Sequence, residues 1–202
     1  MTPAPVASLA DRLKMALGRY AADPVLAPLA AQSPLVPPIG PMPAPVMILG
    51  EAPGREETIR GAPFVGPAGA HLNHLLKRAG LNRAHAFVTN AVMFRPPGNR
   101  TPLPFEYMAG RGLLREEIAI VAPTVLISLG AVAWNTIGRM TMPLGTEPPS
   151  YHEARGKWHT IIPVSGPSIA TLCTWHPSAA LRSAQADEEL AAHLKTILGV
   201  SA

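Results

Sequence analysis

Glu51, Asn90 and His176 each follow a short apolar run of the kind that forms a buried strand. If these strands are neighbours in one sheet, a carboxylate, an amide and an imidazole meet in one cleft. Taken singly, Asn90 could close a local turn and His176 could be a core histidine. Occurring together, each followed by proline or glycine turn residues, they indicate a binding or catalytic site.

The chemistry that suits this set is the recognition and release of a flat, polar ring. An amide offers a donor and an acceptor to a ring edge, and Phe64, in the stretch "APFVG", offers a face for stacking. His176 could donate to a carbonyl oxygen that gains negative charge, and Glu51 could position a water. The sequence holds no Gly-x-Ser-x-Gly elbow, no phosphate loop and no metal-ligand spacing. The residues therefore describe the excision of a nucleobase.

The elements that must position these residues are strands that alternate with helices. We expect strands at residues 46–49, 86–89, 125–129, 159–163 and 170–174, and helices at residues 68–79, 105–121, 131–138 and 187–198. Three of the strands are apolar almost throughout, which indicates burial on both faces. The sequence therefore predicts an α/β fold, a three-layer α/β/α sandwich around a central, mostly parallel sheet.

Residues 1–45 differ in composition from the rest of the chain. An amphipathic helix is expected from about Ser8 to Tyr20, and a proline-rich connector follows it up to Pro45. Proline at this density excludes a long helix or a central strand. We expect the helix and the connector to pack on the surface of a catalytic domain that residues 46–202 form.

The composition is that of a globular protein, with 48% hydrophobic and 15% charged residues. The net charge of +4 suits a polyanion such as nucleic acid or a membrane surface, although many proteins with this balance bind neither. No apolar run is long enough to span a membrane, and the N-terminal residues lack the pattern of a secretion signal. We expect a soluble, cytoplasmic monomer without a membrane partner.

Four segments resemble the ordered motifs of the uracil-DNA glycosylase superfamily, and are most similar to its family 4. They are "GEAPGREETIRGAPFVGPAG", "VTNAVMFRPPGNRTP", "VLISLGAVAW" and "HPSAALR", and the match runs from about Val46 to Arg182. The resemblance implies a monofunctional glycosylase of base excision repair. Such an enzyme flips uracil out of DNA, hydrolyses its N-glycosidic bond and leaves an abasic site.

The resemblance also implies a role for individual residues. Glu51 would lie beside the attacking water, and Glu57, later in the same motif, would also affect activity. Phe64 would stack on the base, Asn90 would read the uracil edge, and His176 would support uracil O2 as the bond breaks. Two small residues would complete the uracil site, Ala52 and Gly54. The DNA contacts would come from Arg95, Arg100, Pro177, Ser178, Leu181 and Arg182.

The chain departs from family 4 in its cysteines. Members of that family usually carry a [4Fe-4S] cluster on four cysteines, whereas Cys173 is the only cysteine here. Phe94 and Gly110 stand at or near two of the cluster positions, and the N-terminal segment has no cysteine. A cluster needs its thiolates, so we expect neither a cluster nor any other metal. Phe94 and the proline-rich connector are expected to replace the cluster by apolar packing, and Cys173 is expected to be a buried, inert thiol.

Two other functions remain open from the residues alone. One keeps the mechanism but changes the base to another deaminated or 5-modified one. The other is a catalytically silent module that binds DNA. Glu51 and His176 argue against the second, because a binding module needs neither a water-positioning carboxylate nor a donor to a leaving group.

Overall fold

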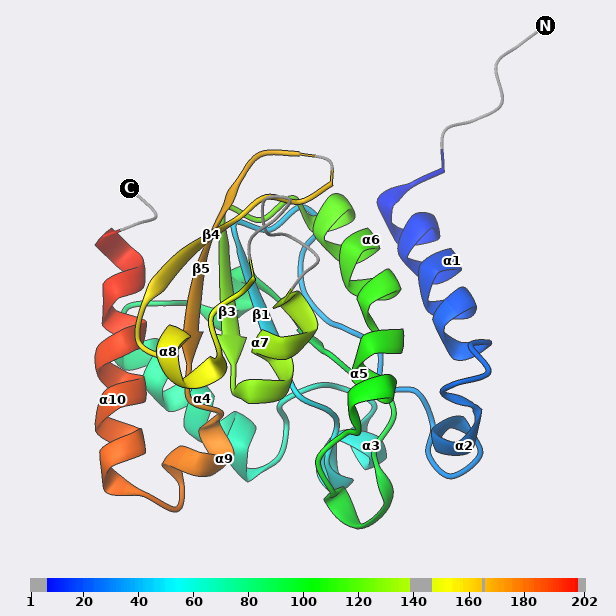
Figure 1. Cartoon of the computed structure of the whole chain (residues 1–202), viewed down its shortest axis with the longest axis horizontal. Helices are drawn as coiled ribbons and strands as arrows, with labels where there is room; N and C mark the ends of the chain where they lie inside the picture. Colours follow the sequence, from blue (N-terminus) through cyan, green and yellow to red (C-terminus); the bar gives the residue numbers. More distant parts are fainter. Residues whose placement is uncertain (1–6, 139–146, 165, 200–202) are drawn as a thin grey trace, which may run out of the picture.

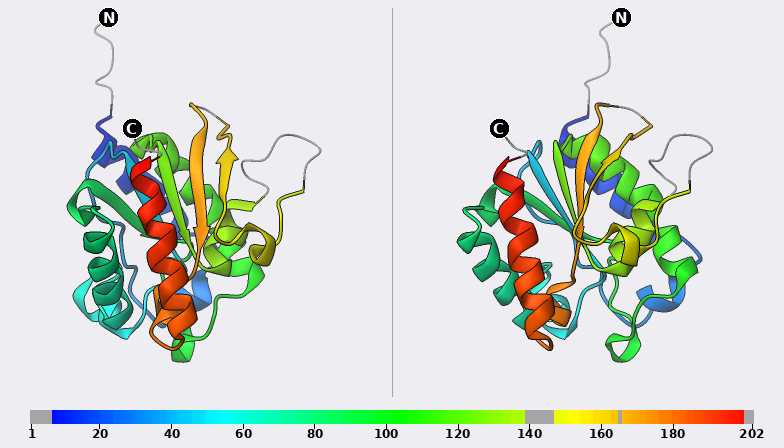
Figure 2. Two further views of the ribbon diagram at one scale, coloured as in Figure 1. Left: turned by 90° about the vertical axis from the view of Figure 1, so that its left-hand side faces the viewer. Right: turned by 60° about the vertical axis from the view of Figure 1, so that its left-hand side comes forward.

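The computed structural model describes residues 7–138, 147–164 and 166–199. Its centre is a β-sheet (Figure 1), which has five strands in the order β2-β1-β3-β5-β4. The strands are β1 (Val46–Gly50), β2 (Ala86–Asn90), β3 (Val125–Leu129), β4 (Trp158–Ile161) and β5 (Ile169–Thr174). The pairs β1–β2, β1–β3 and β3–β5 are parallel, and β4 runs antiparallel beside β5 (Figure 2). The predicted α/β fold with a mostly parallel central sheet is confirmed.

The helices vary in length from four to thirteen residues. They are α1 (Leu9–Ala21), α2 (Ala27–Ala30), α3 (Arg55–Arg60), α4 (Pro67–Arg78), α5 (Pro104–Ala109), α6 (Arg111–Val121), α7 (Ala131–Ile137), α8 (Tyr151–Ala154), α9 (Pro177–Ala180) and α10 (Ala184–Lys195). Short 3-10 turns are formed by η1 (Arg83–His85), η2 (Pro97–Asn99) and η4 (Thr196–Gly199). Within the described residues, no helix is both long and apolar enough to cross a membrane.

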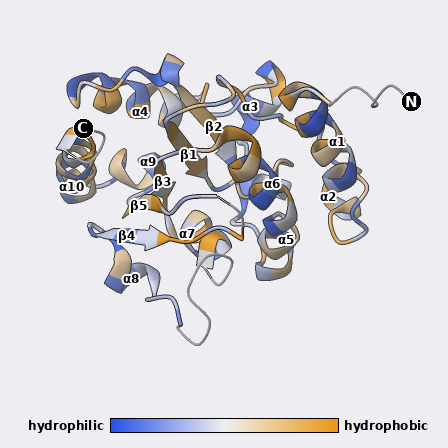
Figure 3. Ribbon diagram, turned by 90° about the horizontal axis from the view of Figure 1, so that it is seen from above, coloured by the Kyte–Doolittle hydropathy of each residue, from blue (hydrophilic) through white to orange (hydrophobic). Residues whose placement is uncertain are grey.

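Helices cover both faces of the sheet, as the view from above shows (Figure 3). On one face α4 and α10 pack on a core that includes Ile48 and Ile127. On the other face α6 and α7 pack on a core that includes Met47 and Leu126, and α1 lies against α6. Successive side chains of a strand point to opposite faces, so these apolar strands serve both cores.

The helix that was predicted over residues 105–121 is instead two helices, α5 and α6, separated at Gly110. The backbone of Gly110 lies so close to Ala91 that an added Cβ would be 2.1 Å from the Ala91 carbonyl oxygen. The break therefore lets the helix pair contact the segment that leaves β2. Two other elements differ from the prediction by two or three residues: β4 ends at Ile161, before Pro163, and the last helix runs from Ala184, after its N-cap Ser183, to Lys195.

The N-terminal segment lies against the domain along both of its parts. Ser8 and Asp11 form a capping box at the start of α1, which buries Leu13, Ala16 and Tyr20. The connector then runs along the outer edge of the sheet, where Ile39 and Val88 of β2 exchange backbone hydrogen bonds of 3.0 and 2.7 Å. This pairing covers an edge strand that would otherwise expose unpaired backbone groups.

Candidate active site

A cleft of about 330 Å³ opens at the carboxyl ends of the parallel strands, where α3 and α9 lie at the lower edge of the molecule in Figure 1. Its walls come from the turns after β1, β2 and β5 and from the segment around Phe64. The lining residues are Glu51, Ala52, Pro53, Gly54, Glu57, Phe64, Ala68, Asn90, Pro96, Asn99, Arg100, His176, Ser178 and Arg182.

Gly50 is the point at which two of the predicted site residues meet. It ends β1 directly opposite Asn90, the last residue of β2. A Cβ added to Gly50 would lie 2.4 Å from Oδ1 of Asn90 and 2.5 Å from the ring of Phe64. Asn90 is 4% exposed and Phe64 is 6% exposed, so both side chains are fixed in place. Gly50 was not among the predicted site residues, although the glycine before Glu51 in "GEAPG" is the signal that could have identified it.

Phe64 sits in a strained turn beside the cleft. Its φ of 53° is in the left-handed region, which residues other than glycine rarely adopt. Its ring centroid lies 5.9 Å from that of His176, with the planes inclined by 32°. On the far side, an added Cβ at Gly69 of α4 would lie 1.9 Å from the Phe64 carbonyl oxygen. The turn is therefore packed tightly on α4, with its ring facing His176.

Glu57 holds this turn from inside α3. Its carboxylate accepts hydrogen bonds from the backbone N–H groups of Val65 at 3.0 Å and Gly66 at 2.7 Å. It also accepts one from the N–H of Gly54 at 3.1 Å. Three backbone donors on one carboxylate join the turn after β1 to the turn that carries Phe64.

Glu51 is placed differently from Glu57. It follows β1 directly, and its carbonyl oxygen accepts the N–H of Val92 at 3.0 Å. Partial burial raises the pKa of the Glu51 carboxyl above its usual value, and no group of the described chain donates a hydrogen bond to it. A carboxylate at the edge of a cleft, to which no described residue donates, is well suited to hold a water.

His176 caps α9, and its ring is held from one side. Nδ1 accepts the backbone N–H of Ser178 at 3.2 Å and lies 2.8 Å from the Ser178 hydroxyl oxygen. Burial lowers the pKa of His176 to about 4, with the charge of Arg182 acting in the same direction. The imidazole is thus neutral at neutral pH, and the bond at Nδ1 leaves the ring proton on Nε2. Gly130, with a φ of 89°, makes room for this residue, since a Cβ there would lie 2.9 Å from that of His176.

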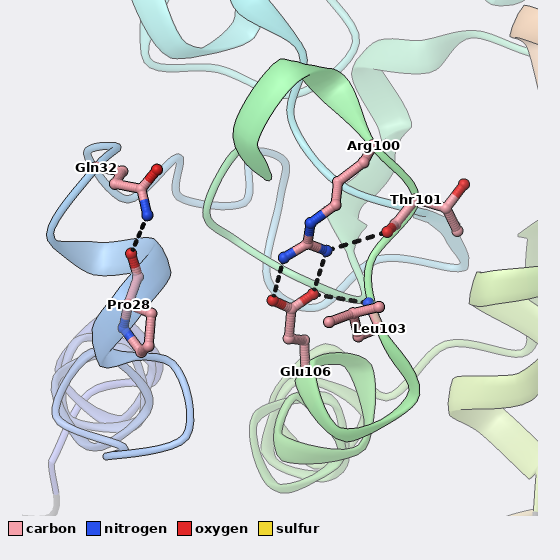
Figure 4. Close-up of polar contacts among 6 residues, drawn as sticks. All are labelled: Pro28, Gln32, Arg100, Thr101, Leu103 and Glu106. Carbon is pink, nitrogen blue, oxygen red and sulfur yellow. Dashed lines mark hydrogen bonds and ion pairs between the residues drawn. The ribbon is translucent and has the colours of Figure 1, made fainter.

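The arginines predicted to contact DNA differ in their surroundings. Arg100 lines the cleft, but its guanidinium makes two hydrogen bonds to buried Glu106, of 2.8 and 2.6 Å (Figure 4). This pairing lowers the pKa of Glu106, which also accepts the N–H of Leu103. Arg95 does not line the cleft, and its Nε donates to Asn99 at 2.6 Å. Arg182 lines the cleft and is exposed.

Two of the remaining predicted DNA contacts lie outside the cleft. Pro177 is buried at the first position of α9, and Leu181, just after that helix, is 50% exposed. Four cleft residues were not predicted, namely Pro53, Ala68, Pro96 and Asn99. They carry no titratable group, and only their position inside the quoted motifs could have identified them.

The segment after β2 forms one wall of the cleft and is held by hydrogen bonds to the N-terminal residues. The N–H of Met93 donates to the Tyr20 hydroxyl at 2.8 Å, and its carbonyl accepts the N–H of Val36 at 2.9 Å. The N–H of Arg95 donates to the Ser33 hydroxyl at 3.2 Å. Between them, Phe94 stacks on Tyr20 with ring centroids 5.7 Å apart.

The comparisons with known proteins agree with this architecture. Residues 37–198 match the family model described as the uracil DNA glycosylase superfamily. A type-4 uracil-DNA glycosylase of Pyrobaculum aerophilum is 38% identical over 151 residues, which cover 73% of each chain. One of Archaeoglobus fulgidus is 33% identical over 162 residues, which cover 80% of this chain and 79% of the relative. The chain belongs to the uracil-DNA glycosylase superfamily.

Proposed function

We propose that this protein is a monofunctional uracil-DNA glycosylase, which hydrolyses the bond between uracil and deoxyribose in DNA and leaves an abasic site. The observation that carries the proposal is the meeting of the Asn90 amide and the Phe64 ring at Gly50, with His176 facing the same ring. Asn90 to read the base edge, Phe64 to stack on the base and His176 to donate to the leaving group all line the same cleft. The names of the relatives support the same substrate.

In this proposal the Asn90 amide distinguishes uracil from cytosine. Uracil presents an N3–H donor beside an O4 acceptor, and an amide can satisfy both with its oxygen and its NH₂ group. Cytosine presents the opposite order at these positions. A buried amide at 4% exposure would then be left with two unmatched groups, which is an effective way to reject a base.

Neutral His176 donates from Nε2 to uracil O2. As the bond from N1 to C1′ breaks, its electron pair passes to the uracil ring and raises the negative charge on O2. A fixed donor at that oxygen contributes on the order of 3 kcal/mol, by analogy with oxyanion donors in other enzymes. The uracil anion leaves and takes up a proton from solvent.

Glu51 positions the water that completes the reaction. The water oxygen forms a new bond to C1′ of the sugar, and its proton passes to the carboxylate. The negative charge of Glu51 also stabilises the positive charge that develops on the sugar. Glu57 acts indirectly, because its carboxylate is occupied by three backbone donors that fix the turns on either side of α3.

The reaction ends at hydrolysis. A lyase step needs an amine that forms a Schiff base with the sugar, and none of the described residues that line the cleft is a lysine. We therefore assign the protein one chemical step, the release of the base. In this proposal Arg182 and Leu181, which are exposed at the end of α9, contact the DNA around the flipped nucleotide.

The residues of this chain do not fit an iron–sulfur cluster, and we infer that the enzyme works without one. Cys173, the only cysteine, is buried in β5. A side chain at Gly110 would collide with the Ala91 carbonyl, so that position has no room for a thiolate. An apolar cluster fills the region between α1 and the segment after β2, and includes Tyr20, Leu29 and Phe94. Iron bound to the purified protein would contradict this inference.

The function is tested with oligonucleotides that hold one uracil, either single-stranded or paired with guanine or adenine. Alkali cleaves the abasic site, so strand breakage reports the release of the base. Hypoxanthine and 5-hydroxymethyluracil in the same sequence test whether another base is the substrate. Breakage at uracil only is expected. Tight binding to every oligonucleotide without breakage would contradict the proposal and identify a DNA-binding module.

A further inference from the structure

Arg83 binds the turn that carries Phe64 although it lies on a different element, the 3-10 turn η1 between α4 and β2. Its guanidinium donates to the carbonyl oxygens of Pro63 at 2.6 Å and Phe64 at 2.8 Å. A third bond, of 2.7 Å, goes to Oδ1 of Asn73 on α4. The Arg83 side chain is half-buried and does not line the cleft, and its guanidinium is bound by these three acceptors.

The turn needs such support because Phe64 is in a left-handed conformation, with a φ of 53°. A residue with a Cβ stays in this region only when its surroundings hold it there. Glu57 accepts the N–H groups of Val65 and Gly66, which follow the phenyl ring in the chain. Arg83 occupies the two carbonyl oxygens on the other side. The Glu57 carboxylate on the backbone N–H groups and the Arg83 guanidinium on the backbone carbonyls thus hold this turn from both ends.

We propose that Arg83 is a positioning residue that fixes the Phe64 ring for stacking on the flipped base, as the counterpart of Glu57. This inference rests on the proposed function and extends it to a residue that touches no substrate. The planar guanidinium fork is essential, because it can donate to two neighbouring carbonyl oxygens at once. A lysine has no such fork, and holds one oxygen well or two poorly.

If Arg83 has this role, its replacement should weaken binding only to DNA that carries a base at the flipped position. Two short single-stranded oligonucleotides separate this role from a general effect on folding. One holds 2′-fluoro-2′-deoxyuridine, whose fluorine slows loss of the base, and the other holds a tetrahydrofuran abasic-site analogue. Arg83→Met should raise the Kd for the first about tenfold and leave the Kd for the second within about twofold. Arg78→Met, an exposed change of the same type at the end of α4, should alter neither.

A double-mutant cycle with Phe64→Leu shows whether the two residues act together. Once the phenyl ring is gone, Arg83→Met should cause no further loss of binding to the fluorinated oligonucleotide. Full additivity, or an equal loss on both oligonucleotides, would overturn the inference and leave Arg83 with a structural role only. If Arg83→Met does not fold, Arg83→Lys carries the test. It should raise the Kd for the fluorinated oligonucleotide about threefold, and wild-type binding by Arg83→Lys would overturn the inference.

A third oligonucleotide, with thymidine at the same position, distinguishes this inference from the proposed function. If wild-type protein binds the 2′-fluoro-2′-deoxyuridine and thymidine oligonucleotides equally well, the uracil site itself is contradicted. If wild-type protein prefers 2′-fluoro-2′-deoxyuridine over thymidine and Arg83→Met keeps both affinities unchanged, only the role of Arg83 is contradicted.

Discussion

Ser178 donates its backbone N–H to Nδ1 of His176 over 3.2 Å, and this bond determines which ring nitrogen carries the proton. Since the pKa of His176 is lowered by burial to about 4, the ring is a neutral donor at Nε2. Nitrogen NMR of labelled protein should show the neutral Nε2–H tautomer from about pH 5 to about pH 9. The signal is assigned by its loss in His176→Asn. A ring that titrates near pH 6.5 would contradict the neutral-donor mechanism.

The rise of the rate with pH should be set mainly by Glu51. Its pKa is raised by burial, so the carboxylate is lost at a higher pH than for an ordinary glutamate. Single-turnover rates should rise with pH through this pKa and then stay level, because His176, with a pKa of about 4, is already neutral where the rate levels off. Glu51→Gln should lower the plateau by about 10² to 10⁴-fold and remove the rise. An unchanged rise in Glu51→Gln would assign the titration to another group.

Gly50→Ala should damage the site more than its size suggests. The new methyl would overlap both Oδ1 of Asn90 and the Phe64 ring, so one of them must move. We expect a loss of at least about a hundredfold in the single-turnover rate, and a cost of roughly 1–3 kcal/mol in unfolding free energy. Gly112→Ala on α6 is the control, since nothing lies within 4 Å of its Cβ. Equal activity of the two variants would contradict the close approach at Gly50.

Glu117 should make the protein less stable as the pH rises. It is fully buried on α6, where the Thr89 hydroxyl donates to it, and burial raises its pKa to about 8. Between the ordinary value of 4.5 and 8 the folded state keeps a proton that the unfolded state has lost. Stability is therefore full below the ordinary pKa and falls as the pH rises towards 8, by on the order of 4 kcal/mol.

Chemical denaturation from about pH 5 to about pH 9 measures this effect, with Glu117→Gln as the test variant. The amide does not titrate, so the fall in stability should disappear in this variant. Glu188→Gln, an exposed change on α10, should leave the fall in place. A pH dependence that Glu117→Gln does not alter would contradict this prediction, because Glu117 would then not be the group that holds the extra proton in the folded state.

The strands and the convergence of the main site residues could be predicted from local sequence. Apolar runs mark strands that are buried on both faces, and parallel strands end at the same edge of a sheet. That is why Glu51, Asn90 and His176 were expected in one cleft before their register was known. Gly50 opposite Asn90 and Leu129 opposite Thr174 then place these ends side by side.

Other features depend on tertiary contacts that leave no pattern in the sequence. The partner of Arg100 is Glu106, which neutralises a side chain that sequence alone presents as a free phosphate contact. The break at Gly110 arises from its approach to Ala91, which a helical pattern does not reveal. Arg83 follows α4 in the chain and binds the turn that precedes α4, so its spacing from Phe64 carries no signal.

The central claim is that Asn90 and His176 act on a flipped uracil in this cleft. Its most direct test is the single-turnover rate of uracil release by Asn90→Ala and His176→Ala, with exposed Asn135→Ala and His74→Ala as matched controls. We predict a loss of at least about a hundredfold in both cleft variants, and wild-type rates in both controls. Wild-type rates in the folded cleft variants would place the chemistry elsewhere and contradict the account.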